Sequence, residues 1–243
     1  MLNASAQFKS EMNNDNRNFL PYADITLLNG TVLNLTPSEI WEGTFKVEDA
    51  TSASGKFTIG AAIATKLSFT INNIYDDFSE YDFVGASIVG YIGLKLGDGT
   101  VEKIRFGTLD VYDIPQYSGS LITVTALDAI SKFNKSYDKS TLKFPATLQD
   151  ILVGACTDCG VTLLSNSFDN SALSVQSRPA ANSSTYADIV SCVVQIAGCF
   201  ARCDTYGRLY LSWYKYNLFN DNVLTSGGIF DDTTKASYQT GDT

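Results

Sequence analysis

Residues 147–161 read TLQDILVGACTDCGV, and residues 185–200 read TYADIVSCVVQIAGCF. Both stretches begin with Thr-x-x-Asp, the capping-box pattern in which side chains satisfy the free N–H groups of a helix's first turn. Both have a glycine thirteen positions after the threonine (160 − 147 and 198 − 185), as expected of the left-handed residue that closes a helix. Apolar residues come directly after each glycine. The pair therefore predicts two units, each a capped helix that leads into a β-strand.

The first half of the chain predicts β-strands. Asn29-Gly30 separates residues 25–28 from residues 32–35, which is the strongest short signal for a β-hairpin. Further strands are expected at residues 41–47, 67–71, 87–96, 101–112 and 121–127. About eight closely spaced strands before Asp128, with turn residues between them, indicate a barrel or a sandwich.

The chain is therefore expected to be α+β and mainly β. We divide it into an N-terminal arm with a short helix (1–21), a β-barrel-like, tube-like domain (22–133), a small α/β domain with the two helix–strand units (134–198) and a hairpin that starts a second β-domain (199–243). Residues 134–143 are polar and are predicted to form a linker. The last segment is rich in Asn, Asp, Gly and Thr and lacks a stop signal, so we expect the natural protein to continue.

Composition and charge argue against two classes of protein. Of the 243 residues, 26 are acidic and 17 basic, and the formal net charge is −9. Phosphate binding relies on clustered Lys and Arg, whereas the basic residues here are scattered, so we expect no stable nucleic-acid binding. No stretch approaches the roughly 20 apolar residues that span a bilayer, and the polar N-terminus has no signal-peptide core. We expect no membrane span.

No catalytic motif is found. The chain has no histidine, which excludes Ser-His-Asp and Cys-His sites and every histidine-ligated metal site. The glycines form neither a G-x-G-x-x-G nor a Walker-type loop, so no nucleotide cofactor is indicated. We therefore predict no enzyme activity, no cofactor, and no catalytic, cofactor-binding or metal-binding residue. A carboxylate pair for glycoside hydrolysis stays open, because distances in space decide it.

The cysteines do not suggest a disulfide framework, because they are odd in number and all lie in the second half. They are Cys156, Cys159, Cys192, Cys199 and Cys203. The C-x-x-C of the first pair resembles half of a zinc site, and the last pair offers a second half. The first pair, however, falls late in the first predicted helix, on its apolar face, where unpaired cysteine behaves as a small hydrophobe. We favour burial in the core over a four-cysteine metal site.

An acidic loop is the one candidate contact surface. Asp76, Asp77, Glu80 and Asp82 place four carboxylates in seven residues with no basic residue among them. The spacing lacks the order of a calcium-binding loop. Such charge runs are usually solvated faces, and contact with a partner protein is the functional alternative.

An ordered series of short motifs resembles a known family. It comprises Trp41-Glu-Gly43, Ile59-Gly60-Ala61-Ala62, the loop 76–82, Tyr91-Ile-Gly93-Leu94, Ala126-Leu-Asp128, Phe144-Pro145, Arg178-Pro179, Ala197-Gly198-Cys199-Phe200 and residues 204–211. From about residue 24 to residue 213, this series resembles the N-terminal region of phage and prophage tail-tip proteins, which are tail-associated structural proteins related to baseplate hubs.

The resemblance implies a virion structural protein. Proteins of that family are typically trimers that close the distal end of the tail tube, with two tube-like β-barrel domains flanking a smaller α/β domain. It implies tail tube, distal tail and tape-measure proteins as partners, and host-recognition or wall-degrading parts connected to the same tip. It also implies a homotrimer in the full-length form, assembly in the bacterial host cytoplasm, a place in the virion tail, and a lumen through which DNA can pass.

Two other classes of function stay open. A carbohydrate-binding β-domain that recognises a bacterial surface glycan would present exposed aromatic residues, for which Trp41, Tyr91 and Trp213 are candidates. Ordinary burial is the competing explanation for all three. The other class is a cell-wall hydrolase that uses carboxylates.

Overall fold

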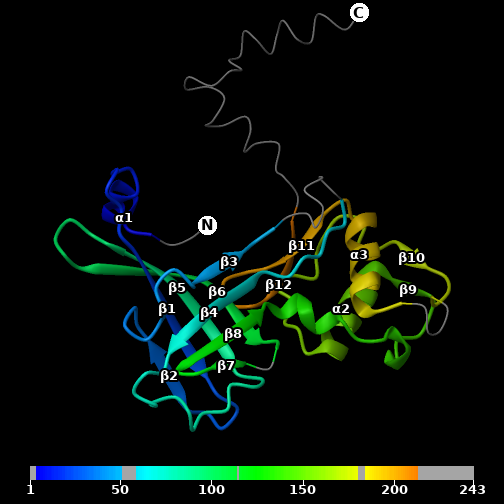
Figure 1. Cartoon of the computed structure of the whole chain (residues 1–243). Helices are drawn as coiled ribbons and strands as arrows, with labels where there is room; N and C mark the ends of the chain where they lie inside the picture. Colours follow the sequence, from blue (N-terminus) through cyan, green and yellow to red (C-terminus); the bar gives the residue numbers. More distant parts are fainter. Residues whose placement is uncertain (1–3, 51–58, 114, 180–183, 213–243) are drawn as a thin grey trace, which may run out of the picture. The chain divides into compact units, whose positions relative to one another are not determined.

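Figure 1 shows the computed structural model of the chain, in which residues 4–50, 59–113, 115–179 and 184–212 are described. The chain divides into two units, Met1–Leu211 and Ser212–Thr243, and the elements described below belong almost entirely to the first. Most of these elements are strands, with three α-helices in the described ranges. The predicted α+β, mainly β fold is confirmed.

A large antiparallel sheet dominates the first 127 residues (Figure 1). Its strands are β1 (Phe19–Thr26), β2 (Val32–Leu35), β3 (Lys46–Glu48), β4 (Lys66–Asn72), β5 (Ser87–Lys95), β6 (Val101–Val111), β7 (Gln116–Ser118) and β8 (Leu121–Leu127). The order across the sheet is β2-β1-β5-β6-β8-β4-β3, and β7 pairs with β8 beside this path. The hairpin predicted at Asn29-Gly30 is confirmed, because β1 and β2 pair in antiparallel register around it.

The inward side chains of the sheet form one core. Alternate residues of a strand point to opposite faces, and in β8 every second side chain, from Ile122 to Ala126, is buried. The buried residues of β1 and β4, such as Ile25 and Phe69, belong to the same hydrophobic cluster. Because β1 and β4 lie near opposite ends of the strand order, the sheet must curve to bring these residues together.

The sheet is nevertheless open. Among the described residues, β2 pairs only with β1 and β3 only with β4, so the two end strands do not meet. The barrel-like domain expected from the sequence is therefore an open, curved sheet among the described residues, and its strands do not close into a barrel. The end strands are four and three residues long, which leaves little edge for closure.

The strand predicted at residues 41–47 is wrong over most of its length. A turn occupies its first half, in which the Thr44 amide donates to the Trp41 carbonyl at 3.2 Å. Gly43 has a φ of +74°, which a β-strand does not allow. The alternation of apolar residues in this segment therefore arises from a turn followed by the short strand β3.

The hairpin of β5 and β6 extends beyond the core and meets the N-terminal helix α1 (Ala6–Glu11). Phe8 of α1 packs in a small cluster with Leu94, Leu96 and Ile104 of this hairpin. The backbone N–H of Ser5, the N-cap of α1, donates to the Glu102 carboxylate at 2.9 Å. The predicted short helix in the N-terminal arm is thus confirmed, and it is anchored to the sheet.

The two capped helices are confirmed at their predicted starts. They are α2 (Leu148–Cys159) and α3 (Tyr186–Ile196), with Thr147 and Thr185 as N-caps. The hydroxyls of these threonines accept from the backbone N–H groups of Asp150 and Asp188 at 3.1 and 3.2 Å. In return, each aspartate carboxylate accepts from the backbone N–H of its threonine, so both capping boxes are complete.

The glycines after the helices are also where the pattern places them. Gly160 has a φ of +67° and Gly198 a φ of +70°, the left-handed conformation that residues with a Cβ rarely adopt. The segments after these two glycines differ between the units. After Gly198 comes strand β11 (Phe200–Cys203), whereas after Gly160 the strand is reduced to a single parallel bridge between Leu163 and Leu209.

The buried faces of the two helices form a second hydrophobic core with neighbouring segments. It joins buried residues of α2 and α3 with Phe133 of a 3-10 turn (η1, Ala129–Phe133) and with Leu209 of β12 (Leu209–Ser212). Tyr137, in a second turn (η2, Tyr137–Lys139), is 3% exposed and belongs to this core. Residues 134–143 are therefore not a free linker as predicted, since one of their side chains is part of the core.

Four further pairings involve the second half of the chain. The hairpin predicted from residue 199 onward is confirmed for the described residues as β11 and β12, which pair with each other; its predicted residues 213 and 214 lie outside the described residues. The Ala201 amide of β11 donates to the Ala61 carbonyl at 2.9 Å, and the Leu209 amide of β12 donates to the Thr162 carbonyl at 2.8 Å. Two short strands, β9 (Ala146–Thr147) and β10 (Ser174–Val175), pair beside the start of α2.

Asp128 connects the large sheet to the second core. Its carboxylate accepts from the backbone N–H groups of Thr65 and Ile130, at 2.9 and 3.0 Å. The Asp128 amide donates back to the Thr65 carbonyl at 3.0 Å. Burial raises the pKa of this carboxyl, and the two amide donors oppose that effect by stabilising the charged form.

The caps give a direct test of the helix starts. Replacing Thr147 or Thr185 with Ala should each cost about 1 kcal/mol of unfolding free energy, because a first-turn N–H loses its acceptor. Urea unfolding followed by circular dichroism measures the change. Thr157→Ala is the control, since Thr157 lies in the last turns of α2, is exposed and is not an N-cap. An equal loss in the control and the cap variants would contradict the capping role.

Candidate interaction surfaces

The four acidic residues of the loop between β4 and β5 are all exposed. They are Asp76, Asp77, Glu80 and Asp82. Asn73, which is 7% exposed, holds this loop in its conformation through hydrogen bonds of its side chain. Its side-chain oxygen accepts from the Phe78 amide at 2.8 Å, and its side-chain amide donates to the Ser79 hydroxyl at 2.9 Å. The carboxylates are thus held at the surface by a buried amide.

The four carboxylates have different roles within the loop. Asp76 has a φ of +64° and its carboxylate accepts from the Ser79 hydroxyl. Asp82 accepts from the Val84 amide at 3.0 Å, which shapes the turn before β5. Within the described ranges, Asp77 and Glu80 make no ion pair, and no group of three or more His, Cys, Asp or Glu residues could hold a metal ion. Contact of this loop with a partner stays a prediction.

Two of the three aromatic candidates for sugar binding, Trp41 and Tyr91, lie within the described residues. Trp41 is 44% exposed and lines a groove of about 710 Å³ with Phe19, Phe45 and Ile92. Tyr91 is half-buried, and burial followed by a hydrogen bond to the Asp24 carboxylate raises the pKa of its hydroxyl. Trp213 lies outside the described residues.

The cysteines of the predicted helix are buried in the second core, as expected. Cys156 and Cys159 are 3% and 4% exposed on the inner face of α2, and both are free thiols. Burial raises the pKa of Cys156 to about 12, with the neighbouring Cys159 adding to the shift. Such thiols stay protonated and unreactive near neutral pH.

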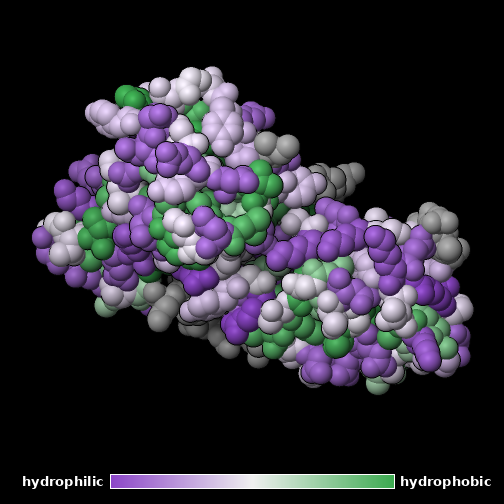
Figure 2. Space-filling model, turned by 90° about the horizontal axis from the view of Figure 1, so that it is seen from below, coloured by the Kyte–Doolittle hydropathy of each residue, from purple (hydrophilic) through white to green (hydrophobic). Residues whose placement is uncertain are grey.

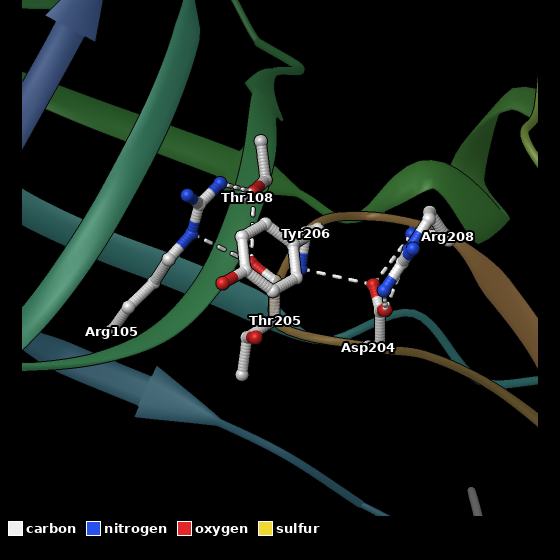
Figure 3. A network of polar contacts seen from close by, with 6 residues as sticks. All are labelled: Arg105, Thr108, Asp204, Thr205, Tyr206 and Arg208. Carbon is white, nitrogen blue, oxygen red and sulfur yellow. Dashed lines mark hydrogen bonds and ion pairs between the residues drawn. The ribbon is translucent and has the colours of Figure 1, made fainter. Parts of the chain in front are cut away.

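A polar network that the sequence did not predict fastens the β11–β12 turn to the large sheet (Figure 3). Arg105 of β6 donates from Nε to the Thr205 carbonyl at 2.9 Å and from Nη2 to the Thr108 hydroxyl at 2.5 Å. That hydroxyl donates to the same Thr205 carbonyl at 2.9 Å. One carbonyl of the turn is therefore held by two donors from β6.

Tyr206 lies between the guanidinium groups of two arginines (Figure 3). The Cζ atoms of Arg105 and Arg208 are 4.5 and 5.3 Å from its ring centroid, within the range of a cation–π interaction. Arg208 also donates from Nε to the Asp204 carboxylate at 2.8 Å. Although burial opposes it, this hydrogen bond keeps the pKa of Asp204 below its usual range. The network thus orders the turn internally and against the sheet.

None of the helices in the described ranges is both long and apolar enough to cross a membrane.

Comparisons with known proteins give no match to a protein family and none to a curated protein. Solved structures do match. One is the 43 kDa tail protein of prophage MuSo2 from Shewanella oneidensis, at 17% identity and a TM-score of 0.48, covering 80% of this chain and 56% of that one. Another is the tail protein from Neisseria meningitidis MC58, at 14% identity and a TM-score of 0.48, covering 81% and 52%.

A chain of the half-lidded Francisella PdpA–VgrG complex matches at 14% identity and a TM-score of 0.52. The match covers 90% of this chain and 35% of that one, so this chain spans between about a third and just over half of the structures it matches. The predicted resemblance to phage and prophage tail proteins is confirmed for the fold. At 14% identity, the match with a TM-score of 0.52 shows a shared fold and no more.

The sequence contained one weak signal for the missed network. The sequence pattern of Thr205-Tyr206-Gly207 predicts a turn, and Arg208 directly follows it, but Arg105 lies about a hundred residues earlier in the chain, on β6. Only the fold brings Arg105 to this turn. The groove around Trp41 was missed for the same reason, since Phe19 and Ile92 come from different strands.

The network predicts a local effect. Arg105→Gln should cost roughly 1–2 kcal/mol, because it removes a charged donor and a cation–π contact, and should speed amide hydrogen exchange at Asp204 and Leu209. Lys103→Gln is the control, because it removes the same charge from the same strand, where Lys103 lies over the Tyr22 ring. Equal exchange in both variants would show that the network does not fasten the hairpin.

Proposed function

We propose that this chain is a structural, non-enzymatic component of a phage or prophage tail tip. In this role it closes the distal end of the tail tube and connects it to host-recognition or wall-degrading parts. The observation that supports this proposal most is the fold shared with a chain of the PdpA–VgrG complex over 90% of the residues. The lack of histidine and the buried, protonated cysteines are consistent with a structural role.

The open sheet fits such an assembly. The end strands β2 and β3 each have one partner strand within the described residues, so each has a free edge. Free edges of a sheet can be paired or covered by neighbouring subunits in a symmetric ring. We propose a homotrimer in the full-length protein, with tail tube, distal tail and tape-measure proteins as partners.

The same proposal extends to organisation and place. The arm (1–21), the tube-like domain (22–133), the small α/β domain (134–198) and the start of a second β-domain (199–243) are the proposed units. The protein would assemble in the bacterial host cytoplasm and reside in the virion tail. The net charge of −9 favours a lumen that lets DNA pass without binding it.

Tail particles provide the test. An epitope tag at the N-terminus, introduced into the strain that carries the gene, should place immunogold label at one end of purified tails. Deletion of the gene should yield particles without functional tails, and a plasmid copy should restore them. Label that is absent from purified tails, with normal tails in the deletion strain, would contradict the proposal.

A glycan-binding role has one specific observation in its favour. Trp41 is partly exposed in a groove that it shares with Phe19 and Phe45. For a tail-tip scaffold we expect no binding on an array of bacterial surface glycans, for the wild type or for Trp41→Ala. Glycan binding by the wild type that Trp41→Ala abolishes would replace the scaffold proposal with the carbohydrate-binding alternative.

A further inference from the structure

One end of the large sheet is formed by three turns that meet in space. The β1–β2 turn and the β4–β5 loop line a common groove. The backbone N–H of Asn73, in the β4–β5 loop, donates to the Ser120 carbonyl of the β7–β8 turn at 2.7 Å. Figure 2 views the molecule from the side where these turns lie in Figure 1. It shows hydrophobic atoms set among hydrophilic ones on the part formed by the sheet.

The groove has an apolar wall and an acidic rim. Its volume is about 240 Å³, and it is lined by Leu27, Leu28, Asn29, Glu80, Tyr81, Asp82 and Val84. Leu28 is 79% exposed and Val84 47% exposed, although both are large apolar side chains. Exposed apolar side chains gathered beside a groove are typical of a binding surface.

The charges in the lining of this groove have a single sign, since Glu80 and Asp82 line it and no lysine or arginine does. Residues 18–45, 67–94 and 106–131, which include the strands and turns at this end, contain no lysine or arginine. The second range contains Asp76, Asp77, Glu80 and Asp82, the acidic residues of the loop that contributes to the groove.

We propose that this groove receives a lysine or arginine side chain of a partner protein. Such side chains have an apolar stem and a charged head, which is the combination that the groove matches. The stem would lie along Leu28 and Val84, and the head would pair with the Glu80 and Asp82 carboxylates. The ring of Tyr81 adds an aromatic wall, against which a guanidinium can stack.

In this proposal the acidic loop binds a basic segment of another protein. The ordering of the loop by the buried Asn73 is then explained, because a binding surface gains affinity when its shape exists before the partner arrives. The assignment holds whether or not the chain belongs to a tail tip, since it depends only on this groove. Failure of the tail-localisation experiment would leave it intact, and its own failure would not affect the tail proposal.

Labelled peptides test the groove. The probe is a twelve-residue Gly-Ser peptide with three arginines, and its controls have lysine or the uncharged isostere citrulline at the same positions. Fluorescence anisotropy with the full chain should show binding of the arginine and lysine peptides, weakened by salt, and no binding of the citrulline peptide. Binding of the citrulline peptide with equal affinity, or no binding of any peptide up to about 1 mM, would overturn the proposal.

Matched variants separate the groove from the general acidity of the chain. Glu80→Gln combined with Asp82→Asn should weaken arginine-peptide binding about tenfold, while the new side-chain carbonyl at position 82 can still accept from the Val84 amide. The control is Asp15→Asn combined with Glu42→Gln, which removes the same charge from exposed residues outside the groove. Equal weakening by both pairs would overturn the proposal.

The apolar wall is tested in the same way. Leu28→Ser should weaken peptide binding severalfold without loss of folding, because this side chain is already exposed. Leu173→Ser, which changes another exposed leucine far along the chain, should leave binding unchanged. Unfolding in calcium chloride tests whether the carboxylates bind a metal ion instead. If about 1 mM calcium raises the midpoint of thermal unfolding of the wild type but not of the Glu80/Asp82 variant, they do, and the proposal fails.

Discussion

The alternation of apolar side chains in the large sheet is the constraint on which the rest of the structure depends. Strands β1, β4 and β8 each have buried residues at alternate positions on one face, and these rows join one cluster. In a flat sheet the apolar rows of β1 and β4 would be far apart and exposed to water, so the sheet must curve. A bulge in β6 assists: the register with β5 shifts between Gly90 and Tyr91 and leaves Phe106 without a partner residue. The Phe106 ring lies against Gly90, where a Cβ would be 2.2 Å from that ring.

Hydrogen bonds of defined geometry attach the second core to this sheet. Asp128 fixes the point at which the chain leaves β8, because its buried carboxylate has two backbone N–H partners. Arg105 of β6 fixes a second point, because it donates a hydrogen bond to the turn between β11 and β12. Apolar packing alone would allow the helices to slide, whereas hydrogen bonds of defined geometry select one arrangement. The two cores are therefore joined at separate points along the sheet.

The exposed features of the chain are consistent with a protein that acts through contacts. Two short edge strands, an aromatic groove around Trp41 and an acidic groove beside Leu28 all lie on the sheet half of the chain. The buried thiols of the helical half, Cys156 among them, are held in the core in protonated form. The exposed grooves and edge strands thus lie on one half of the chain, and the buried thiols lie on the other.

By itself the sequence determined the local elements: the capping boxes at Thr147 and Thr185, the left-handed glycines and the antiparallel hairpins, because these depend on residues close in the chain. It also placed the acidic loop at the surface. Only the tertiary structure decided that the sheet stays open, that the segment around Tyr137 is core, and that Arg105 meets Tyr206. These depend on side chains from distant positions, whose meeting is set by the curvature and register of the sheet and not by any spacing along the chain.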